Sequence, residues 1–174
     1  MKATTKRIVM TALLAALVCG ATMSIRIPTT STGGYIHPGD ALVILSGVIL
    51  GPVYGFLAAG IGSAFADLLG GYFIYVPITL FIKGFIALFT GLVYQKMQKS
   101  AATRYIAVTI GGIIDVIFVA FGYFFCESFM YGVAGAAASI PANLILGLGG
   151  MLISMVLYPA VISIREVREI QHMK

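Results

Sequence analysis

Long apolar runs, separated by short polar segments, make up most of the chain from Ile8 to Ile164. A hydrocarbon core of about 30 Å requires about 20 apolar residues for each spanning helix. The chain is therefore long enough for five or six spanning helices and leaves no room for a separate soluble domain. The five clearest runs predict helices over residues 8–25, 54–69, 78–94, 105–125 and 140–164.

The stretch 41–69 is too long for one span and too short for two full ones, and a Gly-Pro pair stands near its middle at 51–52. Charge distinguishes the alternatives. Two short helices, 41–50 and 54–69, place the basic cluster at 96–104 on the same side as the basic N-terminus, whereas one helix separates the two clusters. Because cytoplasmic segments carry the excess of Lys and Arg, we predict the hairpin.

The predicted fold class is an all-α integral membrane protein with six transmembrane helices, a hairpin of short helices 2 and 3, and both termini cytoplasmic. One transmembrane domain is expected to cover residues 1–174. The composition agrees, because 60% of the residues are hydrophobic and 10% are charged, whereas soluble domains carry about 25% charged residues. The net charge of +5 comes mainly from Lys and Arg at the ends of apolar runs. This pattern indicates membrane orientation rather than nucleic-acid binding.

The N-terminal run has the basic start and apolar centre of a signal peptide. We interpret it as a retained first helix, because later runs are equally apolar and have basic flanks of their own. Cys19 and Cys126 lie within or at the edge of apolar runs, where a thiol usually behaves as a small hydrophobic side chain. No structural disulfide is expected.

Two segments rich in polar residues, glycine or aromatics, 28–39 and 70–77, are predicted as external loops. Residues 127–139 are predicted as a third external segment, whose small-residue run 132–138 is either a tight turn or an extension of the last helix. Non-helical backbone is not tolerated in hydrocarbon, because its polar groups have no partners there. The connector 96–104 and the C-terminal segment 164–174 are basic and are predicted on the cytoplasmic side.

Charged side chains within a bilayer are rare and usually face a protein interior or a water-filled cavity. Lys83 lies about 8 Å below the outer end of its helix at 1.5 Å per residue, and it either snorkels to the outer surface or lines a site. Asp115 lies near mid-depth and either forms an ion pair with Lys83 or contacts a ligand. Asp40 directly follows a Pro-Gly pair, where a helix N-cap is expected, and Asp67 lies close to the outer edge.

Six further residues are candidates for the same outer site. Each also has a structural interpretation: an interfacial aromatic belt for the tyrosines, a surface position for the histidine, and satisfaction of backbone groups for the glutamate and the asparagine. The histidine and Asp40 would not complete a metal site by themselves. The six are Tyr35, His37, Tyr72, Tyr75, Glu127 and Asn143.

Every acid outside the C-terminal segment, and the one intramembrane lysine, fall in the outer half of the predicted bundle or at mid-depth. Glycines nearby permit close backbone approach, and aromatic residues surround them. This one-sided polarity predicts an outward-opening pocket for a small, polar, ring-containing molecule.

In the first predicted helix, Ala12, Ala16 and Gly20 recur every four residues and therefore lie on one face. Small side chains at this spacing let another helix approach closely in lipid. The stripe predicts either docking of a partner or packing within this chain. The sequence has no phosphate-binding loop, HExxH helix or CxxC pair, so we predict no catalytic residue, no metal site and no motor of its own.

The chain resembles the substrate-binding S components of energy-coupling factor (ECF) vitamin importers. The resemblance rests on the six-helix plan, the Ala12 and Ala16 stripe, IPTTSTGGYIHPGD at 27–40, and LGPVYGFLAAGIGSAFADLLGGYFIYVPITLFIKG at 50–84. It implies a multi-pass subunit of a prokaryotic plasma membrane that binds a vitamin from outside. It also implies docking through the first helix onto a transmembrane coupling subunit (T component) driven by two ATP-binding cassette ATPases. ATP and Mg would be used by those partners, and this chain would hold no cofactor.

The GGYxHxGD and ADLLGGYF segments are most similar to the branch associated with vitamin B6 or the thiamine precursor hydroxymethylpyrimidine. Riboflavin, pantothenate and other vitamins remain alternatives, because family members share a scaffold while their pockets diverge. From the residues alone, two other classes also remain open. One is a stand-alone secondary transporter or small channel that uses Asp115 and Lys83 as a proton or ion relay, and the other is a membrane scaffold without a ligand.

Overall fold

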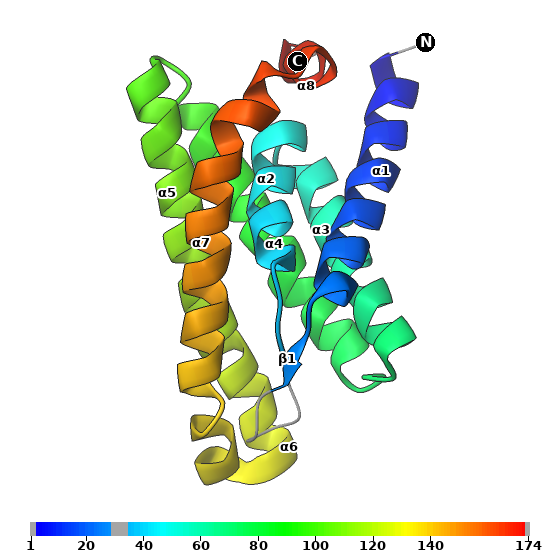
Figure 1. Ribbon diagram of the computed structural model, residues 1–174, viewed down its shortest axis with the longest axis vertical. Coiled ribbons are helices and arrows are strands. Elements are labelled where there is room, and N and C mark those ends of the chain that lie inside the picture. Colours follow the sequence, from blue (N-terminus) through cyan, green and yellow to red (C-terminus); the bar gives the residue numbers. More distant parts are fainter. Residues whose placement is uncertain (1–2, 29–34, 173–174) are drawn as a thin grey trace.

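The computed structural model describes residues 3–28 and 35–172, and most of this part is helical (Figure 1). Five helical runs within it are long and apolar enough to cross a membrane, which indicates a multi-pass membrane protein. The elements in chain order are α1 (Ala3–Ser24), β1 (Ile27–Pro28), β2 (Tyr35–Ile36), α2 (Gly39–Leu50), α3 (Pro52–Gly70), α4 (Tyr75–Lys96), α5 (Ala101–Ile117), η1 (Phe118–Gly122), α6 (Tyr123–Ala137), α7 (Ile140–Ser163) and α8 (Arg165–His172).

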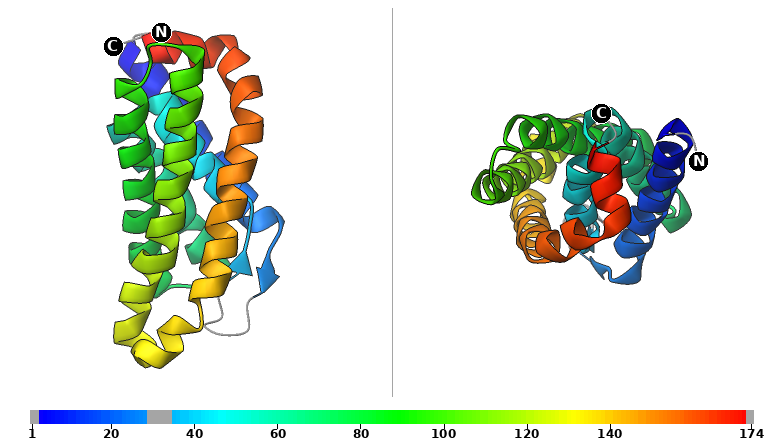
Figure 2. Two further views of the ribbon diagram at one scale, coloured as in Figure 1. Left: turned by 90° about the vertical axis from the view of Figure 1, so that its left-hand side faces the viewer. Right: turned by 90° about the horizontal axis from the view of Figure 1, so that it is seen from above.

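Helix α2 forms the centre of the bundle. Eleven of its 12 residues are buried, and it packs against α1, α3, α4 and α7, which surround it (Figure 2). At 1.5 Å per residue it is about 18 Å long, shorter than a bilayer core. Of the six predicted transmembrane helices, five therefore reach spanning length among the described residues, and α2 is a short internal helix.

The predicted hairpin of helices 2 and 3 is present, but only its first helix is short. Gly51 joins α2 to α3 with a φ of 79°, a backbone conformation that glycine adopts without steric cost. Pro52 begins α3, at the position where proline is tolerated because its missing N–H has no helical partner. Helix α3 then continues for 19 residues and is long enough to span.

The predicted end of the fifth helix near residue 125 is wrong, and so are both alternatives for the run 132–138, a tight turn or an extension of the last helix. The helical run that begins with α5 continues through η1 and α6 to Ala137. Its apolar aromatic residues support a helix, and the break that glycine introduces is confined to Gly132, whose φ is 76° and ψ 162°. The predicted loop 70–77 is also shorter than expected, because α4 already begins at Tyr75.

The first turn of α1 and helix α8 lie at one end of the bundle, and α6 lies at the other (Figure 1). The C-terminal segment forms the short helix α8, which sequence analysis did not predict. It lies across the end of the bundle, buries Val167 and Ile170, and forms an ion pair between Glu169 and Lys6 of α1. At the opposite end β1 and β2 pair antiparallel, with Ile27 opposite Ile36, within the predicted loop 28–39. Residues 29–34 of that loop lie outside the described part.

Candidate functional site

A cavity with an empty volume of about 660 Å³, its open mouth included, lies toward the α6 end of the bundle. Helices α3, α4 and α6 contribute to its walls, together with the end of α1 and the start of α7. Strand β2, the residue after it and the α3–α4 turn complete the walls. The lining residues are Thr22, Ile36, His37, Ser63, Asp67, Tyr72, Tyr75, Thr79, Lys83, Tyr123, Glu127, Ser139, Ala142, Asn143 and Leu146.

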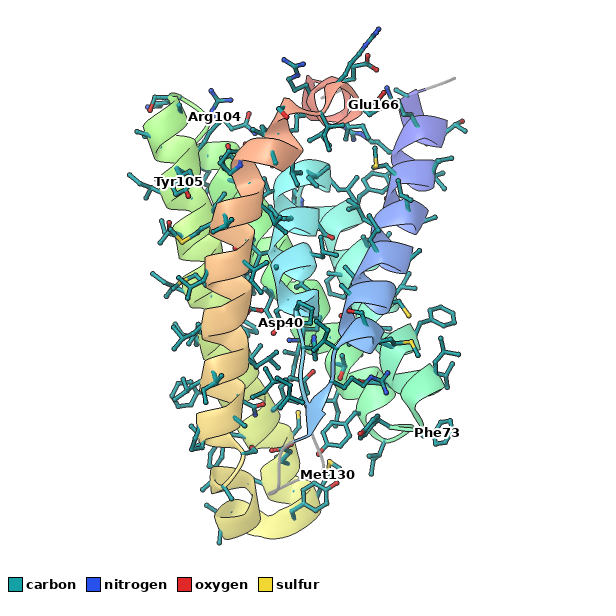
Figure 3. All side chains as sticks on the ribbon, viewed as in Figure 1. Asp40, Phe73, Arg104, Tyr105, Met130 and Glu166 are labelled. Atoms are coloured by element: carbon teal, nitrogen blue, oxygen red, sulfur yellow. The ribbon has the colours of Figure 1, made fainter. Side chains whose placement is uncertain are left out.

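Seven of the ten residues predicted for the outer site lie on this wall: His37, Asp67, Tyr72, Tyr75, Lys83, Glu127 and Asn143. Tyr35 belongs to β2 by its backbone, and its side chain lies outside the described part of the structure. Asp40 and Asp115 are not on the wall and are fully buried. Figure 3 shows Asp40 inside the bundle at the start of α2, whereas Phe73 and Met130 lie at its periphery.

Glu127 is held rigidly at the cavity wall by hydrogen bonds to both of its oxygens. The Tyr75 hydroxyl donates to Oε1 at 3.0 Å, and the Ser139 hydroxyl donates to Oε2 at 2.5 Å. The Asn143 amide in turn donates to Ser139 Oγ at 3.4 Å. This network joins α4, α6 and α7 around the cavity, so the carboxylate of Glu127 serves mainly to fix the positions of its neighbours.

A second set of contacts joins α4 to α6. The hydroxyls of Thr79 and Tyr123 share a hydrogen bond at 2.9 Å, and the Tyr123 ring lies 5.7 Å from Lys83 Nζ, measured to the ring centroid. The rings of Tyr75 and Tyr123 are 6.3 Å apart. The π turn η1 precedes Tyr123, and such turns often occur in helices at functional sites. The result is an aromatic wall with a cation beside it.

Lys83 is 1% exposed, so of the two alternatives for this residue, snorkelling to the outer surface is wrong. Its Nζ donates to Asp40 Oδ1 at 2.5 Å. Asp40 does not cap α2, because its side chain makes this ion pair inside the bundle and the helix has no side-chain cap. The alternative that Asp115 forms an ion pair with Lys83 is also wrong, because Lys83 pairs with Asp40 in the described part of the chain. Both carboxylate oxygens of Asp115 are buried without a hydrogen-bond partner among the described residues.

His37 lies between strand β2 and α2, and its Nδ1 accepts a hydrogen bond from the Gly39 N–H at 3.1 Å. Burial lowers the pKa of His37 to about 4; Asp40 opposes this shift, and Lys83 and Arg26 add to it. The imidazole is therefore neutral at pH 7, which agrees with Nδ1 acting as an acceptor. A neutral histidine offers the cavity a hydrogen-bonding group without a charge.

Two hydroxyl groups on the wall have no partner within the described part of the chain. Thr22 Oγ1 and Ser63 Oγ are both buried and unpaired, and both residues line the cavity. Buried polar atoms are nearly always hydrogen-bonded. These two hydroxyls are therefore available to a bound molecule.

Several polar wall residues were missed by sequence analysis, although a simple signal identifies them. Each stands four residues before a residue that was predicted, and residues at this spacing share one helix face. The pairs are Ser63 with Asp67, Thr79 with Lys83, Tyr123 with Glu127, and Ser139 with Asn143. Thr22, Ala142 and Leu146 carry no such signal, and Ile36, although four residues before Asp40, lies in β2 and not on a helix.

The small-residue stripe of α1 faces outward. Ala12, Ala16 and Gly20 are all exposed, and a Cβ added at Gly20 would meet no atom within 4 Å. The opposite face of α1 buries Leu14 and Val18 and packs against α3. The alternative that the stripe packs within this chain is therefore wrong for the described residues.

Comparison with known proteins gives a consistent result. The family model described as "ECF-type riboflavin transporter, S component" matches residues 2–163. A protein of Pyrococcus woesei, described as an uncharacterized protein in the gap 3' region, is 33% identical over 132 residues, which are 76% of this chain and 85% of the relative.

A solved structure from work on the structure and mechanism of the S component of a bacterial ECF transporter superposes with a TM-score of 0.63. The alignment covers 92% of this chain and 97% of that chain, at 18% identity. At this identity the match shows that the two chains share a fold.

Proposed function

Because this chain belongs to the family of ECF-type riboflavin transporter S components, we propose that it binds riboflavin from outside the cell and holds it in the cavity lined by Lys83 and Tyr123. An S component is the substrate-binding subunit of its transporter and is not itself an enzyme. The family predicted from the sequence is confirmed by this match. The branch differs, because riboflavin was an alternative there and vitamin B6 or hydroxymethylpyrimidine was favoured.

The observation that carries the proposal is the combination of an aromatic wall with unpaired hydroxyls. Tyr72, Tyr75 and Tyr123 supply faces and edges for a planar ring system, and aromatic contacts of this kind contribute beyond simple burial. Thr22 Oγ1 and Ser63 Oγ supply free hydrogen-bonding groups. Riboflavin combines a planar three-ring system with a hydroxylated chain, so both kinds of group have a counterpart on the vitamin.

The proposed orientation places the cavity toward the outside of a prokaryotic plasma membrane. The end of the bundle with α8 carries many basic side chains: Lys6 belongs to the start of α1 and Arg165 to α8, and Arg104 lies at the same end (Figure 3). Cytoplasmic ends of membrane proteins carry such an excess. The cavity lies toward the other end, so a ligand reaches it without crossing the bilayer.

We propose that ATP and Mg are used by partner subunits: a T component and two ATP-binding cassette ATPases. The exposed stripe of Ala12, Ala16 and Gly20 on α1 supports docking of the T component there, because small residues let helices approach closely in lipid. In this arrangement the described chain supplies recognition, and its partners supply the energy.

A binding experiment tests the substrate. Purified protein in detergent is titrated with riboflavin, pyridoxine and hydroxymethylpyrimidine, and riboflavin binding is followed by the quenching of its fluorescence on stacking. We expect riboflavin to bind far more tightly than the other two compounds. Tight binding of pyridoxine or hydroxymethylpyrimidine with no response to riboflavin would reject riboflavin and favour the alternative branch.

A matched pair of serine variants tests the site. Ser63→Ala removes a hydroxyl that faces the cavity without a protein partner, and we expect it to weaken riboflavin binding about fivefold to tenfold, as for one lost hydrogen bond. Ser154→Ala removes a hydroxyl that is equally buried but bonded to Met151 O within α7, and it should leave affinity unchanged. Equal effects of the two substitutions would place the ligand elsewhere.

The stand-alone transporter has a separate test. Liposomes that contain the purified protein alone are expected to bind riboflavin without accumulating it, whereas addition of the partner subunits and ATP allows uptake. ATP-independent uptake by this chain alone would favour the secondary transporter or channel.

A further inference from the structure

Three charged or chargeable side chains meet beneath the cavity, one from each of three helices. Asp40 comes from α2, Lys83 from α4 and Asp115 from α5. Asp40 and Asp115 are 0% exposed and Lys83 is 1% exposed. The charged groups that act on Asp115 are Asp40 and Lys83, so the three form one electrostatic unit, the Asp40–Lys83–Asp115 cluster.

The side chains of Asp40 and Asp115 converge at Gly150 of α7. A Cβ added at Gly150 would lie 2.5 Å from Asp40 Cβ and 3.2 Å from Asp115 Oδ2. Helix α7 therefore contributes a bare backbone surface to the cluster and no titratable group. Only glycine leaves room there for the two acidic side chains to stand side by side.

Some carboxylate oxygens of the cluster have no hydrogen-bond partner among the described residues. Lys83 donates to Asp40 Oδ1, while Asp40 Oδ2 and both oxygens of Asp115 have no partner in the described part of the chain. With both acids ionised, the cluster would hold two negative charges and one positive charge away from water. An uncompensated buried charge is strongly unfavourable, so the arrangement requires one further positive charge.

We propose that the Asp40–Lys83–Asp115 cluster is a buried proton-binding site, in which Asp115 holds one proton and Asp40 remains ionised beside Lys83. The geometry favours a proton over a metal cation, because the Lys83 ammonium already stands beside the carboxylates and repels a second cation of full charge. A protonated Asp115 also gains a donor, and the free Oδ2 of Asp40 is an available acceptor. The cluster is then neutral overall.

The proton site acts on the cavity through Lys83, which contacts the cluster and also lines the wall. If Asp115 lost its proton, its carboxylate would compete with the ligand for the Lys83 ammonium. The resident proton therefore keeps Lys83 available to a bound molecule. This consequence rests on the proposed binding function, whereas the proton site itself does not.

Infrared spectroscopy of the purified protein without ligand tests the proton directly. A protonated carboxyl group has a C=O stretching band well separated from those of carboxylates and amides. We expect this band in the wild-type protein at pH 7 and its loss in Asp115→Asn. Asp67→Asn, which changes an acid on the cavity wall, should leave the band in place. Absence of the band from the wild-type protein at pH 7 would overturn the proposal without requiring any variant.

Two substitutions of similar size then distinguish the two acids. Asp115→Asn imitates the protonated acid and is expected to keep the melting temperature. It should change riboflavin affinity less than about threefold. A threefold change corresponds to roughly half of the 1.4 kcal/mol that a tenfold change represents. Asp40→Asn leaves the Lys83 ammonium without its buried partner and should lower the melting temperature markedly. The reverse order, with Asp115→Asn the destabilised variant, would show that Asp115 is the ionised partner and would overturn the assignment.

Sodium provides the remaining test. A melting temperature that rises with sodium at constant ionic strength in the wild type, but not in Asp115→Asn, would identify a bound metal cation and overturn the proposed proton site.

The tests of the proton site can be distinguished from the test of the substrate. The infrared band without riboflavin binding would reject the proposed substrate and retain the proton site, and riboflavin binding without the band would do the opposite.

Discussion

Lys83 connects the cavity to the buried charges, so its substitution has a predictable cost. Lys83→Met fills a similar volume but leaves the Asp40 carboxylate buried without a counter-charge. Breaking one partner of a buried ion pair destabilises a protein by about 3–5 kcal/mol. We therefore expect a large fall in the melting temperature of the detergent-solubilised protein, measured by thermal unfolding.

The control for this prediction is the double variant Lys83→Met with Asp40→Asn, which removes both charges. Replacing a complete buried pair is often close to neutral, so the double variant should regain most of the lost stability. The non-additivity of the two changes measures their coupling. If Lys83→Met alone is as stable as the double variant, the ion pair contributes little to the fold.

His37 gives the protein a pH dependence of known sign. Its pKa is about 4 in the folded protein and about 6.5 in an unfolded chain. Between these values the unfolded state binds more protons, so stability falls as the pH falls from 6.5 to 4, by an amount on the order of 3 kcal/mol in total.

Thermal unfolding at several pH values measures this contribution, with His37→Asn as the comparison. The asparagine side-chain oxygen can replace Nδ1 as the acceptor for the Gly39 N–H, but it does not titrate. The variant should show a flatter dependence of melting temperature on pH in this range. Equal slopes for the two proteins would mean that other groups cause the dependence.

Single residues also show why the site was only partly predictable. Asp67, Lys83 and Asn143 were found because polar side chains are conspicuous in apolar runs. The position of Asp40 deep inside the bundle was not predicted. Counting residues from the end of a helix assumes that this end lies at the membrane surface. Helix α2 begins inside the bundle instead, and this position follows from packing against the surrounding helices rather than from local pattern.

At the scale of helices and strands, Gly132 and Gly149 form a natural matched pair. A Cβ added at either position would meet no atom within 4 Å, so neither substitution by alanine is limited by space. They differ in backbone, because Gly132 has a φ of 76° and Gly149 lies within α7. With its ψ of 162°, Gly132 lies in a region that costs a non-glycine residue about 1–3 kcal/mol, whereas alanine is favoured over glycine by about 1 kcal/mol inside a helix.

We therefore predict that Gly132→Ala lowers the melting temperature and that Gly149→Ala leaves it unchanged or raises it. Thermal unfolding of both variants under one set of conditions measures the difference. A Gly132→Ala protein as stable as Gly149→Ala would show that the break in α6 is not required by the fold.

Helix positions were predicted well where the run of apolar residues alone determines them. The predicted 140–164 corresponds to α7 at Ile140–Ser163, and 41–50 corresponds to α2 at Gly39–Leu50. The helix predicted at 105–125 was ended too early because small residues cluster at 132–138, although α6 needs only one non-helical residue to change direction. Helix α8 was not predicted, because its stability depends on burying Val167 and Ile170 against the bundle.

At the scale of the whole molecule, the cavity and the proposed docking surface lie at different places along and around the bundle. The cavity lies toward the end with α6, the basic side chains concentrate at the end with α8, and the stripe of α1 lies on a side of the bundle. In the proposed function, this separation would allow a ligand and a membrane partner to be bound at once. Binding and docking should then be impaired independently.

Substitution of Ala16 tests this independence. Ala16→Trp places a bulky ring on the exposed stripe of α1, which should prevent close approach of a partner helix. We expect uptake of labelled riboflavin by cells that contain the complete transporter to be lost. The purified variant should still bind riboflavin with wild-type affinity, because Ala16 is not on the cavity wall.

The control places the same side chain on another lipid-facing surface. Val156 of α7 is 76% exposed and lies outside the stripe, so Val156→Trp should retain both binding and uptake. A loss of uptake in both variants would indicate a general effect of tryptophan on membrane insertion. Unimpaired uptake in Ala16→Trp would reject docking at the stripe, because a partner packed against Ala12, Ala16 and Gly20 cannot accommodate an indole ring without separating from the helix.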